Sequence, residues 1–273
     1  MIINLLLFVL ICMLIYIIFL ISIKKENNEN YENKEENILD NFISIEKLKT
    51  MEFKTGKSDK EYQYRLSDMF KSKIQRHWVY PMDKKKETIK QKHLKYHPNT
   101  IASLYMEQTD DESNYDILID VIKKYKPIDG LKYDENFYED NIIIHLRVGD
   151  WLRDIDINKN IEKYESNTYL KKRKLKGIKY FEKEIEKIEK IPTRNIIFVF
   201  GFHQLHYTEK SREYMFKIGE HFENKGYNVR FKSGDPDDDF VFMVNSKYYI
   251  PTSGGYSKLV ETLQMKINSK ENN

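Results

Sequence analysis

The stretch Asn141-Ile142-Ile143-Ile144-His145-Leu146-Arg147-Val148-Gly149-Asp150-Trp151 decides the fold of this chain. Its first part is an apolar, β-branched run that is too short for a helix and typical of a buried strand. The run ends abruptly in His, Arg, Gly and Asp. Ligands of open α/β sheets bind outside the carboxyl ends of the strands, where a guanidinium can hold a phosphate with two hydrogen bonds. The stretch therefore predicts a strand that delivers Arg147 to one wall of an anion site.

Short apolar runs and amphipathic stretches alternate after this point. Further strands are predicted at residues 195–200, 228–232 and 248–250, and helices at 175–188, 210–225, 240–245 and 256–267. The order strand, helix, strand, helix, strand predicts a parallel sheet with right-handed crossovers. We therefore expect an α/β fold in which residues 140–273 form a Rossmann-like domain.

The N-terminal part of the chain has a different character. Residues 5–23 carry no charge and are long enough to span a bilayer as a helix, which predicts a single-pass anchor over residues 1–23. A cleaved signal peptide is the alternative, but no basic region precedes the run and no small-residue cleavage site follows it. Lys24 and Lys25 follow the run, and no Asn-x-Ser/Thr acceptor occurs, which favours a cytosolic body. A lumenal body stays open, because long domains translocate regardless of flanking charge.

Two further segments separate the anchor from the predicted sheet. Residues 24–41 are polar without an apolar period, which is typical of a linker or stem. Residues 42–139 have a mixed pattern with helical spacing in places, and we expect them to form a separate N-terminal domain.

Composition excludes several classes of protein. The 46 basic and 43 acidic residues leave a net charge of +3, which is too even for a nucleic-acid-binding protein. Cys12 is the only cysteine, so the chain has no intrachain disulfide, cysteine metal site or catalytic thiol.

Polar residues and glycines follow each predicted strand, at the edge where ligands of parallel sheets bind. Gly201 and His203 follow the second strand, and Pro-Thr-Ser-Gly-Gly-Tyr-Ser follows the fourth at residues 251–257. Two glycines between a strand and a helix let backbone N–H groups approach an anion, and the helix start adds its positive dipole end. This turn therefore predicts a phosphate site. A plain tight turn capped by Ser253 or Ser257 is the alternative.

The acidic run Asp235-Pro236-Asp237-Asp238-Asp239 follows the third strand and has two interpretations. A string of this kind suggests a divalent metal. A helix start explains it better, with Asp235 as the cap, Pro236 in the first position and the later carboxylates at the positive end of the helix. We therefore predict no metal site, and we expect Asp239 to approach a base or ribose.

Charged residues near the first strand have both structural and chemical interpretations. Arg147 beside a buried strand needs a partner, which is either a phosphate or a carboxylate such as Asp150. Asp150 is also our candidate catalytic base. His145 and His203 are candidate ligand contacts, with a core histidine and a surface histidine as the respective alternatives.

His145-Leu146-Arg147-Val148-Gly149-Asp150-Trp151 resembles the His-x-Arg-Arg-x-Asp-Tyr peptide of alpha-1,2-fucosyltransferases, which alpha-1,6- and protein O-fucosyltransferases share. Residues 239–263 are similar to the C-terminal motif of those enzymes, in which an acidic residue and a short helix precede an Ile-x-x-Asn-Ser-Ser-Phe-Ser turn. The resemblance covers roughly residues 140–267 through short motifs. Two departures stand out: Val148 replaces the second Arg, and the turn reads Ser-Gly-Gly-Tyr-Ser.

The resemblance implies a GT-B-like fold of two Rossmann-like domains, with GDP-fucose bound by the C-terminal one and neither metal nor other cofactor. Residues 42–139 would lie on the side of a glycan or protein acceptor, and residues 5–23 in the lipid bilayer. Arg147 would bind the pyrophosphate and assist the departure of GDP, with Asp150 as the candidate base. The residues expected to contact the donor are His145, Arg147, Gly201, His203, Asp239, Ser253, Gly254, Gly255, Tyr256 and Ser257.

Two alternatives to a membrane-anchored fucosyltransferase stay open. One is a transferase that uses another nucleotide sugar. The other is a non-catalytic, membrane-tethered module that kept the fold, which Val148 and the altered turn motivate.

Overall fold

The computed structural model describes residues 16, 41–53, 113–128, 130–168, 174–188, 194–201 and 207–271. The predicted span at residues 5–23, apart from Tyr16, and nearly all of the linker at 24–41 lie outside this part of the chain. No helix in the described residues is long and apolar enough to cross a membrane. The described residues from Ile43 onward belong to one compact unit.

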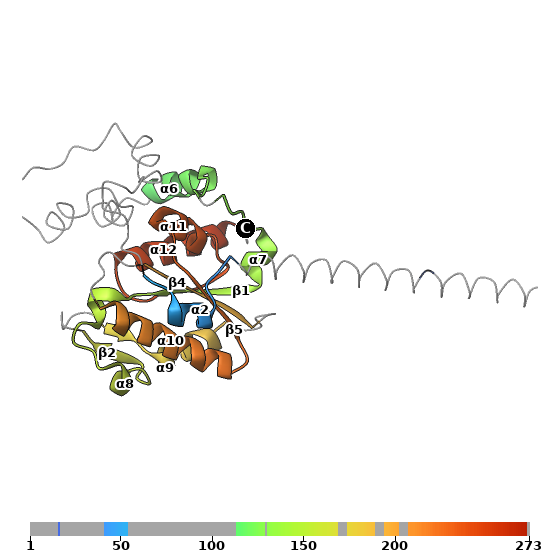
Figure 1. Cartoon of the computed structure of the whole chain (residues 1–273). Helices are drawn as coiled ribbons and strands as arrows, with labels where there is room; N and C mark the ends of the chain where they lie inside the picture. The colour runs from blue at the N-terminus through green and yellow to red at the C-terminus, as the bar shows by residue number, and fades with distance from the viewer. Residues whose placement is uncertain are drawn as a thin grey trace, which may run out of the picture. The chain divides into compact units, whose positions relative to one another are not determined.

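A four-stranded parallel sheet forms the centre of this unit (Figure 1). Its strands are β1 (Asn141–Leu146), β4 (Asn195–Phe200), β5 (Asn228–Lys232) and β6 (Tyr248–Ile250). All three pairings are parallel, in the order β5-β4-β1-β6. The sequence-based expectation of an α/β fold with a parallel sheet is confirmed, and the arrangement is consistent with a Rossmann-like fold.

Helices cover both faces of the sheet, as right-handed crossovers require. Figure 1 shows α9 (Ile178–Glu186) and α10 (Thr208–Asn224) on one face, and α11 (Pro236–Val244) and α12 (Gly255–Glu271) on the other. The helix α6 (Ser113–Lys124) contacts α12. The connections to β4 and β5 run over one face, whereas the connection to β6 runs over the other, so the strand order reverses between β1 and β6.

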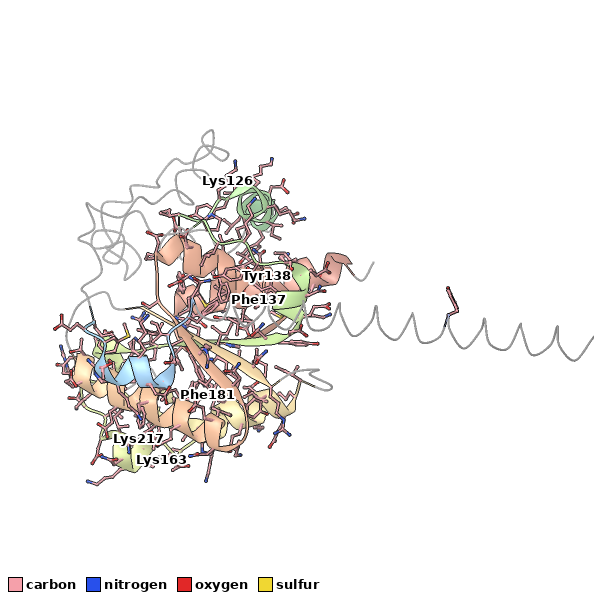
Figure 2. The ribbon with its side chains drawn as sticks, turned by 45° about the vertical axis from the view of Figure 1, so that its right-hand side comes forward. Lys126, Phe137, Tyr138, Lys163, Phe181 and Lys217 are labelled. Atoms are coloured by element: carbon pink, nitrogen blue, oxygen red, sulfur yellow. The ribbon has the colours of Figure 1, made fainter. Side chains whose placement is uncertain are left out.

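The core lies on both faces of the strands, because helices that cover both sides of a sheet bury strand residues on each face. All six residues of β1 are buried. On the face covered by α9 and α10, the ring of Phe198 stacks on Phe231 with centroids 5.4 Å apart and meets Phe181 edge-on. Figure 2 labels Phe181 within this layer and shows Lys163 and Lys217 at its outer surface.

The opposite face has its own aromatic cluster. Phe137 belongs to the short helix α7 (Glu135–Glu139), which precedes β1, and its ring lies 6.1 Å from that of Phe242 on α11. Tyr138, labelled beside Phe137 in Figure 2, lies 5.8 Å from the same ring. This cluster packs α7 against α11.

The connection between β1 and α9 contains elements that the sequence did not reveal. A 3-10 helix η1 (Gly149–Leu152) and a short helix α8 (Ile157–Asn160) follow β1. A two-stranded antiparallel hairpin then joins β2 (Glu165–Asn167) to β3 (Lys174–Lys176). The strands are only three residues long, so they lack the alternating pattern that a sequence-based prediction needs.

The helix α2 (Ile45–Thr50) packs on the sheet, although we expected it in a separate N-terminal domain. Ile43 exchanges two backbone hydrogen bonds of 2.8 Å with Phe231 and thereby covers the edge of β5. Gly219 of α10 permits the close approach of α2, because a Cβ there would lie 2.9 Å from Ile45 Cδ1. Residues 54–112 lie outside the described residues, so a separate domain at 42–139 stays a prediction.

Replacement of Leu48 tests whether α2 is part of this core. Leu48 is fully buried, so Leu48→Ala should lower the free energy of unfolding by about 2–5 kcal/mol through lost burial and a cavity. Thr50→Ala, at the exposed end of the same helix, should change it by no more than about 0.5 kcal/mol. Urea denaturation of the full-length protein measures both. Equal midpoints for the two variants would show that α2 is dispensable.

Candidate functional site

The reversal of strand order places the carboxyl ends of β1 and β6 side by side. Ile144 pairs with Ile250 in the last register step between these strands, so positions 147 and 253 both come three residues beyond it. His145 Nδ1 lies 3.0 Å from Thr252 Oγ1, and this contact links the segments that follow Ile144 and Ile250. The structure therefore brings together the β1 loop (residues 147–152) and the β6 turn (residues 251–255), which the sequence indicated separately.

Arg147 and Asp150 form the charged part of the β1 loop. The Arg147 side chain is 26% exposed, and its Nη2 lies 3.7 Å from Oδ1 of Asp150, whose side chain is 44% exposed. The guanidinium also lies over the ring of Trp151, 5.4 Å from its centroid. Because partly exposed ion pairs are weak, an anion with two charges can compete with Asp150 for Arg147.

The β6 turn exposes backbone at the start of a long helix. Gly254 adopts a φ of 109°, which side chains rarely permit, and no atom of the described residues beyond its chain neighbours lies within 4 Å of the position its Cβ would take. The helix α12 begins at Gly255, and its first N–H groups have no acceptor within the helix, as in any α-helix. The Ser253 hydroxyl donates to the carbonyl oxygen of Lys174 at 2.8 Å, so the β2–β3 hairpin supports the turn.

The starts of α11 and α12 differ in charge. The first turn of α11 carries three carboxylates, whereas the first turn of α12 carries none. In α11 these carboxylates compensate the positive end of the helix dipole. In α12 no acidic side chain of the first turn compensates it. Tyr256 links the two helix starts, because its hydroxyl donates to the carbonyl oxygen of Pro236 at 2.7 Å. Its ring lies 5.7 Å from that of His145.

The acidic run is part of the protein interior. Asp235 caps α11 by accepting a hydrogen bond from the N–H of Asp237 at 3.0 Å, which confirms the predicted helix start. Asp238 accepts hydrogen bonds from the Tyr125 hydroxyl at 2.7 Å and from the N–H of Ile128. Across the described ranges, no three His, Cys, Asp or Glu side chains are grouped as metal ligands.

Asp239, the expected nucleoside contact, has internal partners. It is 5% exposed, and its two oxygens accept from Lys232 Nζ at 2.6 Å and from the N–H of Gly234 at 2.9 Å. Burial raises the pKa of Asp239, and the Lys232 ammonium acts in the opposite direction. The pair closes the connection from β5 to α11, and it gives Asp239 a structural role whether or not a nucleoside is bound.

The other residues that we expected to contact the sugar donor lie in different surroundings. Gly201 follows β4 beside the end of β1 and is exposed, and among the described residues nothing beyond its chain neighbours lies within 4 Å of where a Cβ would stand. Ser257 is fully buried, and its hydroxyl accepts from the N–H of Thr252 at 2.9 Å inside the β6 turn. His203 lies outside the described residues.

Sequence reasoning missed two residues that support these loops. Ser211 of α10 accepts a hydrogen bond from the N–H of Gly149 at 3.0 Å, and Tyr180 of α9 donates to the carbonyl oxygen of Pro251 at 2.6 Å. The partners are 62 and 71 residues apart in the sequence. No local pattern marks such pairs, because only the packed sheet brings them together.

No model of a protein family matches this chain, no curated protein matches its sequence, and no solved structure matches its fold. The residues at the carboxyl edge of the sheet are therefore the basis for a proposed function.

Removal of Lys232 tests the structural role of Asp239. Lys232→Met leaves a buried carboxylate without its cation and should lower the free energy of unfolding by about 3–5 kcal/mol near neutral pH. Burial raises the pKa of Asp239 above the ordinary 3.8, so the folded variant holds that proton to a higher pH than the unfolded chain does. The stability of the variant should therefore fall as the pH rises through that range.

Lys247→Met is the matched control, because it breaks an ion pair with Glu139 in which both side chains are more than 40% exposed. Lys247→Met should lower the free energy of unfolding by no more than about 1 kcal/mol. The double variant Lys232→Met/Asp239→Asn should regain part of the free energy of unfolding that Lys232→Met loses. Chemical denaturation at several pH values measures all of these variants, and equal stability of Lys232→Met and Lys247→Met would contradict the structural role.

Proposed function

We propose that this chain is a glycosyltransferase that binds a nucleoside-diphosphate sugar between the β1 loop and the start of α12. One observation carries the proposal: the 3.0 Å contact of His145 with Thr252 joins the Arg147 loop to a glycine turn at the reversal of strand order. Ligands of doubly wound sheets bind at this topological switch point.

The charges at this edge suit a diphosphate. Arg147 can fork onto two phosphate oxygens, and the first N–H groups of α12 add a dipole end equivalent to about half a positive charge. Gly254 favours a close approach to these N–H groups, because it has no side chain of its own and the described residues leave the position of its Cβ open. The first turn of α12 carries no acidic residue, whereas that of α11 carries three. The start of α12 therefore suits an anion better than the start of α11 does.

Arg147 and α12 would act on the leaving group. The acceptor oxygen attacks the anomeric carbon while the bond from that carbon to the β-phosphate oxygen breaks, and the electron pair stays on the phosphate. Donors aimed at this developing charge stabilise the transition state. The acceptor proton passes to a base, and Asp150 is the candidate because it lies beside Arg147 with a partly exposed carboxylate.

Fucose from GDP-fucose is the donor we propose in particular, on the resemblance of residues 145–151 and 253–257 to fucosyltransferase motifs. The same resemblance supports a GT-B-like fold, a glycan or protein acceptor and a reaction without metal. A single-pass membrane anchor at residues 5–23, with Lys24 and Lys25 on the cytosolic side, completes the proposal.

One observation favours a second candidate function. The family peptide has an Arg where this chain has Val148, which is only 4% exposed and packs in the core. Position 148 therefore supplies no second guanidinium to a phosphate. A nucleotide-binding module without transferase activity would need less charge stabilisation than an enzyme, and donor turnover distinguishes the two.

A thermal-shift titration with GDP, UDP, CMP and ADP tests the nucleotide site in the full-length protein. GDP at a hundredfold excess over its Kd should stabilise the fold by about 2.7 kcal/mol. Arg147→Ala should abolish this shift and leave the unliganded melting temperature nearly unchanged, since the side chain is partly exposed. Arg194→Ala, which removes an exposed guanidinium before the amino end of β4, should keep the full shift.

The four nucleotides give distinct outcomes. A shift with GDP alone, together with hydrolysis of GDP-fucose, supports the fucosyltransferase, and a shift with another nucleotide supports a transferase for a different donor. Binding without donor turnover supports the module. No shift with any nucleotide, or an intact shift in Arg147→Ala, would refute the proposed site.

A further inference from the structure

The β1 loop and the β6 turn are each fastened by a buried serine hydroxyl on a neighbouring helix. Gly149 of the β1 loop donates its N–H to Ser211 of α10 at 3.0 Å. Thr252 of the β6 turn donates its N–H to Ser257 of α12 at 2.9 Å. Both serines are fully buried, and each hydroxyl has hydrogen-bond partners within the protein.

Ser211 holds a piece of backbone in an unfavourable conformation. Its hydroxyl donates to the carbonyl oxygen of Tyr207 at 2.8 Å, and Tyr207 has a left-handed φ of 65° that bulky residues rarely adopt. Gly149, on the other side of the hydroxyl, has a φ of 76°. Arg153 adds a hydrogen bond to the Tyr207 hydroxyl at 3.0 Å. The single hydroxyl of Ser211 thus ties the loop that carries Arg147 to the start of α10.

Ser257 holds the other loop in the same way. Its hydroxyl lies 2.8 Å from the hydroxyl of Tyr249, a residue of β6, in addition to accepting from Thr252. The side chain of Thr252 in turn contacts His145, two residues before Arg147. A displacement of Ser257 would therefore move both the glycine turn and its contact with β1.

We infer that Ser211 and Ser257 are positioning residues that set the separation between Arg147 and the start of α12. This inference rests on the proposed nucleotide site. A bidentate guanidinium contact requires its geometry to within about 0.5 Å, so small shifts of either loop weaken binding. Replacement of either serine by alanine also leaves a buried N–H without its acceptor, which favours such a shift.

Three serine-to-alanine variants of the full-length protein test the inference. Ser246 is the matched control: it is 1% exposed, its hydroxyl donates to the carbonyl oxygen of Met243 at 2.7 Å, and it precedes β6 at the opposite edge of the sheet. Calorimetric titration with GDP measures Kd for each variant. Ser211→Ala and Ser257→Ala should each raise Kd by about tenfold, which corresponds to about 1.4 kcal/mol, while Ser246→Ala leaves it unchanged.

The Arg147→Lys variant distinguishes the role of Ser211 from that of Ser257. Arg147→Lys keeps the charge but loses the forked geometry, so the exact placement of the β1 loop matters less. In that background, Ser211→Ala should raise Kd by much less than tenfold, whereas Ser257→Ala should keep its full effect. A serine that served the fold alone would produce neither pattern.

The outcomes separate this inference from the proposed function. Wild-type protein that binds GDP, together with unchanged Kd in Ser211→Ala and Ser257→Ala, overturns the inference and leaves the proposed site intact. An equal rise of Kd in Ser246→Ala also overturns it, because the effect would then be general loss of stability. Wild-type protein that does not bind GDP removes the nucleotide site, and the positioning role falls with it.

Discussion

The parallel pairing of β1 with β6 is the constraint on which the rest of the structure depends. It adds the fourth strand on the side of β1 opposite to β4, and therefore sends α11 and α12 over one face while α9 and α10 cover the other. Because both faces are covered, β1 is buried along its whole length, and the chain becomes partly exposed at Arg147 just beyond it. Polar residues that follow β1 and β6 are thus forced to the same edge. The contact between His145 and Thr252 is the direct result.

At this edge, polar groups divide into those that hold the fold and those that can meet a ligand. Lys232, Asp239 and Ser257 are buried, and each has a hydrogen-bond partner, which avoids the high cost of unpaired polar groups in the interior. Arg147, Asp150, Gly201 and Gly254 are partly or fully exposed at the same edge. The buried groups make the loops rigid, and the exposed groups then have fixed positions. Fixed positions for Arg147 and the Gly254 turn would suit the charged transition state of the proposed transfer.

The sequence predicted the parts of this fold that have a local signature. All four strands were predicted, β1 and β4 from their runs of apolar residues, and Asp235 with Pro236 marked the start of α11. The η1, α8 and β2–β3 segments and the packing of α2 on β5 were not predictable, because short elements and edge contacts depend on distant partners. The same reason explains Ser211, which looks like any helical serine until the sheet places Gly149 against it. The acidic residue expected to contact the nucleoside, Asp239, has a partner in Lys232 that precedes it by seven residues, and the sequence alone gave no sign that both would be buried.

In the proposed site, an anionic ligand binds between the β1 loop and the start of α12. Amide hydrogen exchange of the full-length protein, with and without GDP, tests this location because it finds the ligand without any substitution. We expect slower exchange in residues 147–152 and 252–258 upon addition of GDP, with no change at residues 245–248 on the opposite edge of the sheet. Protection confined to another region, or exchange rates unaffected by GDP throughout, would contradict it.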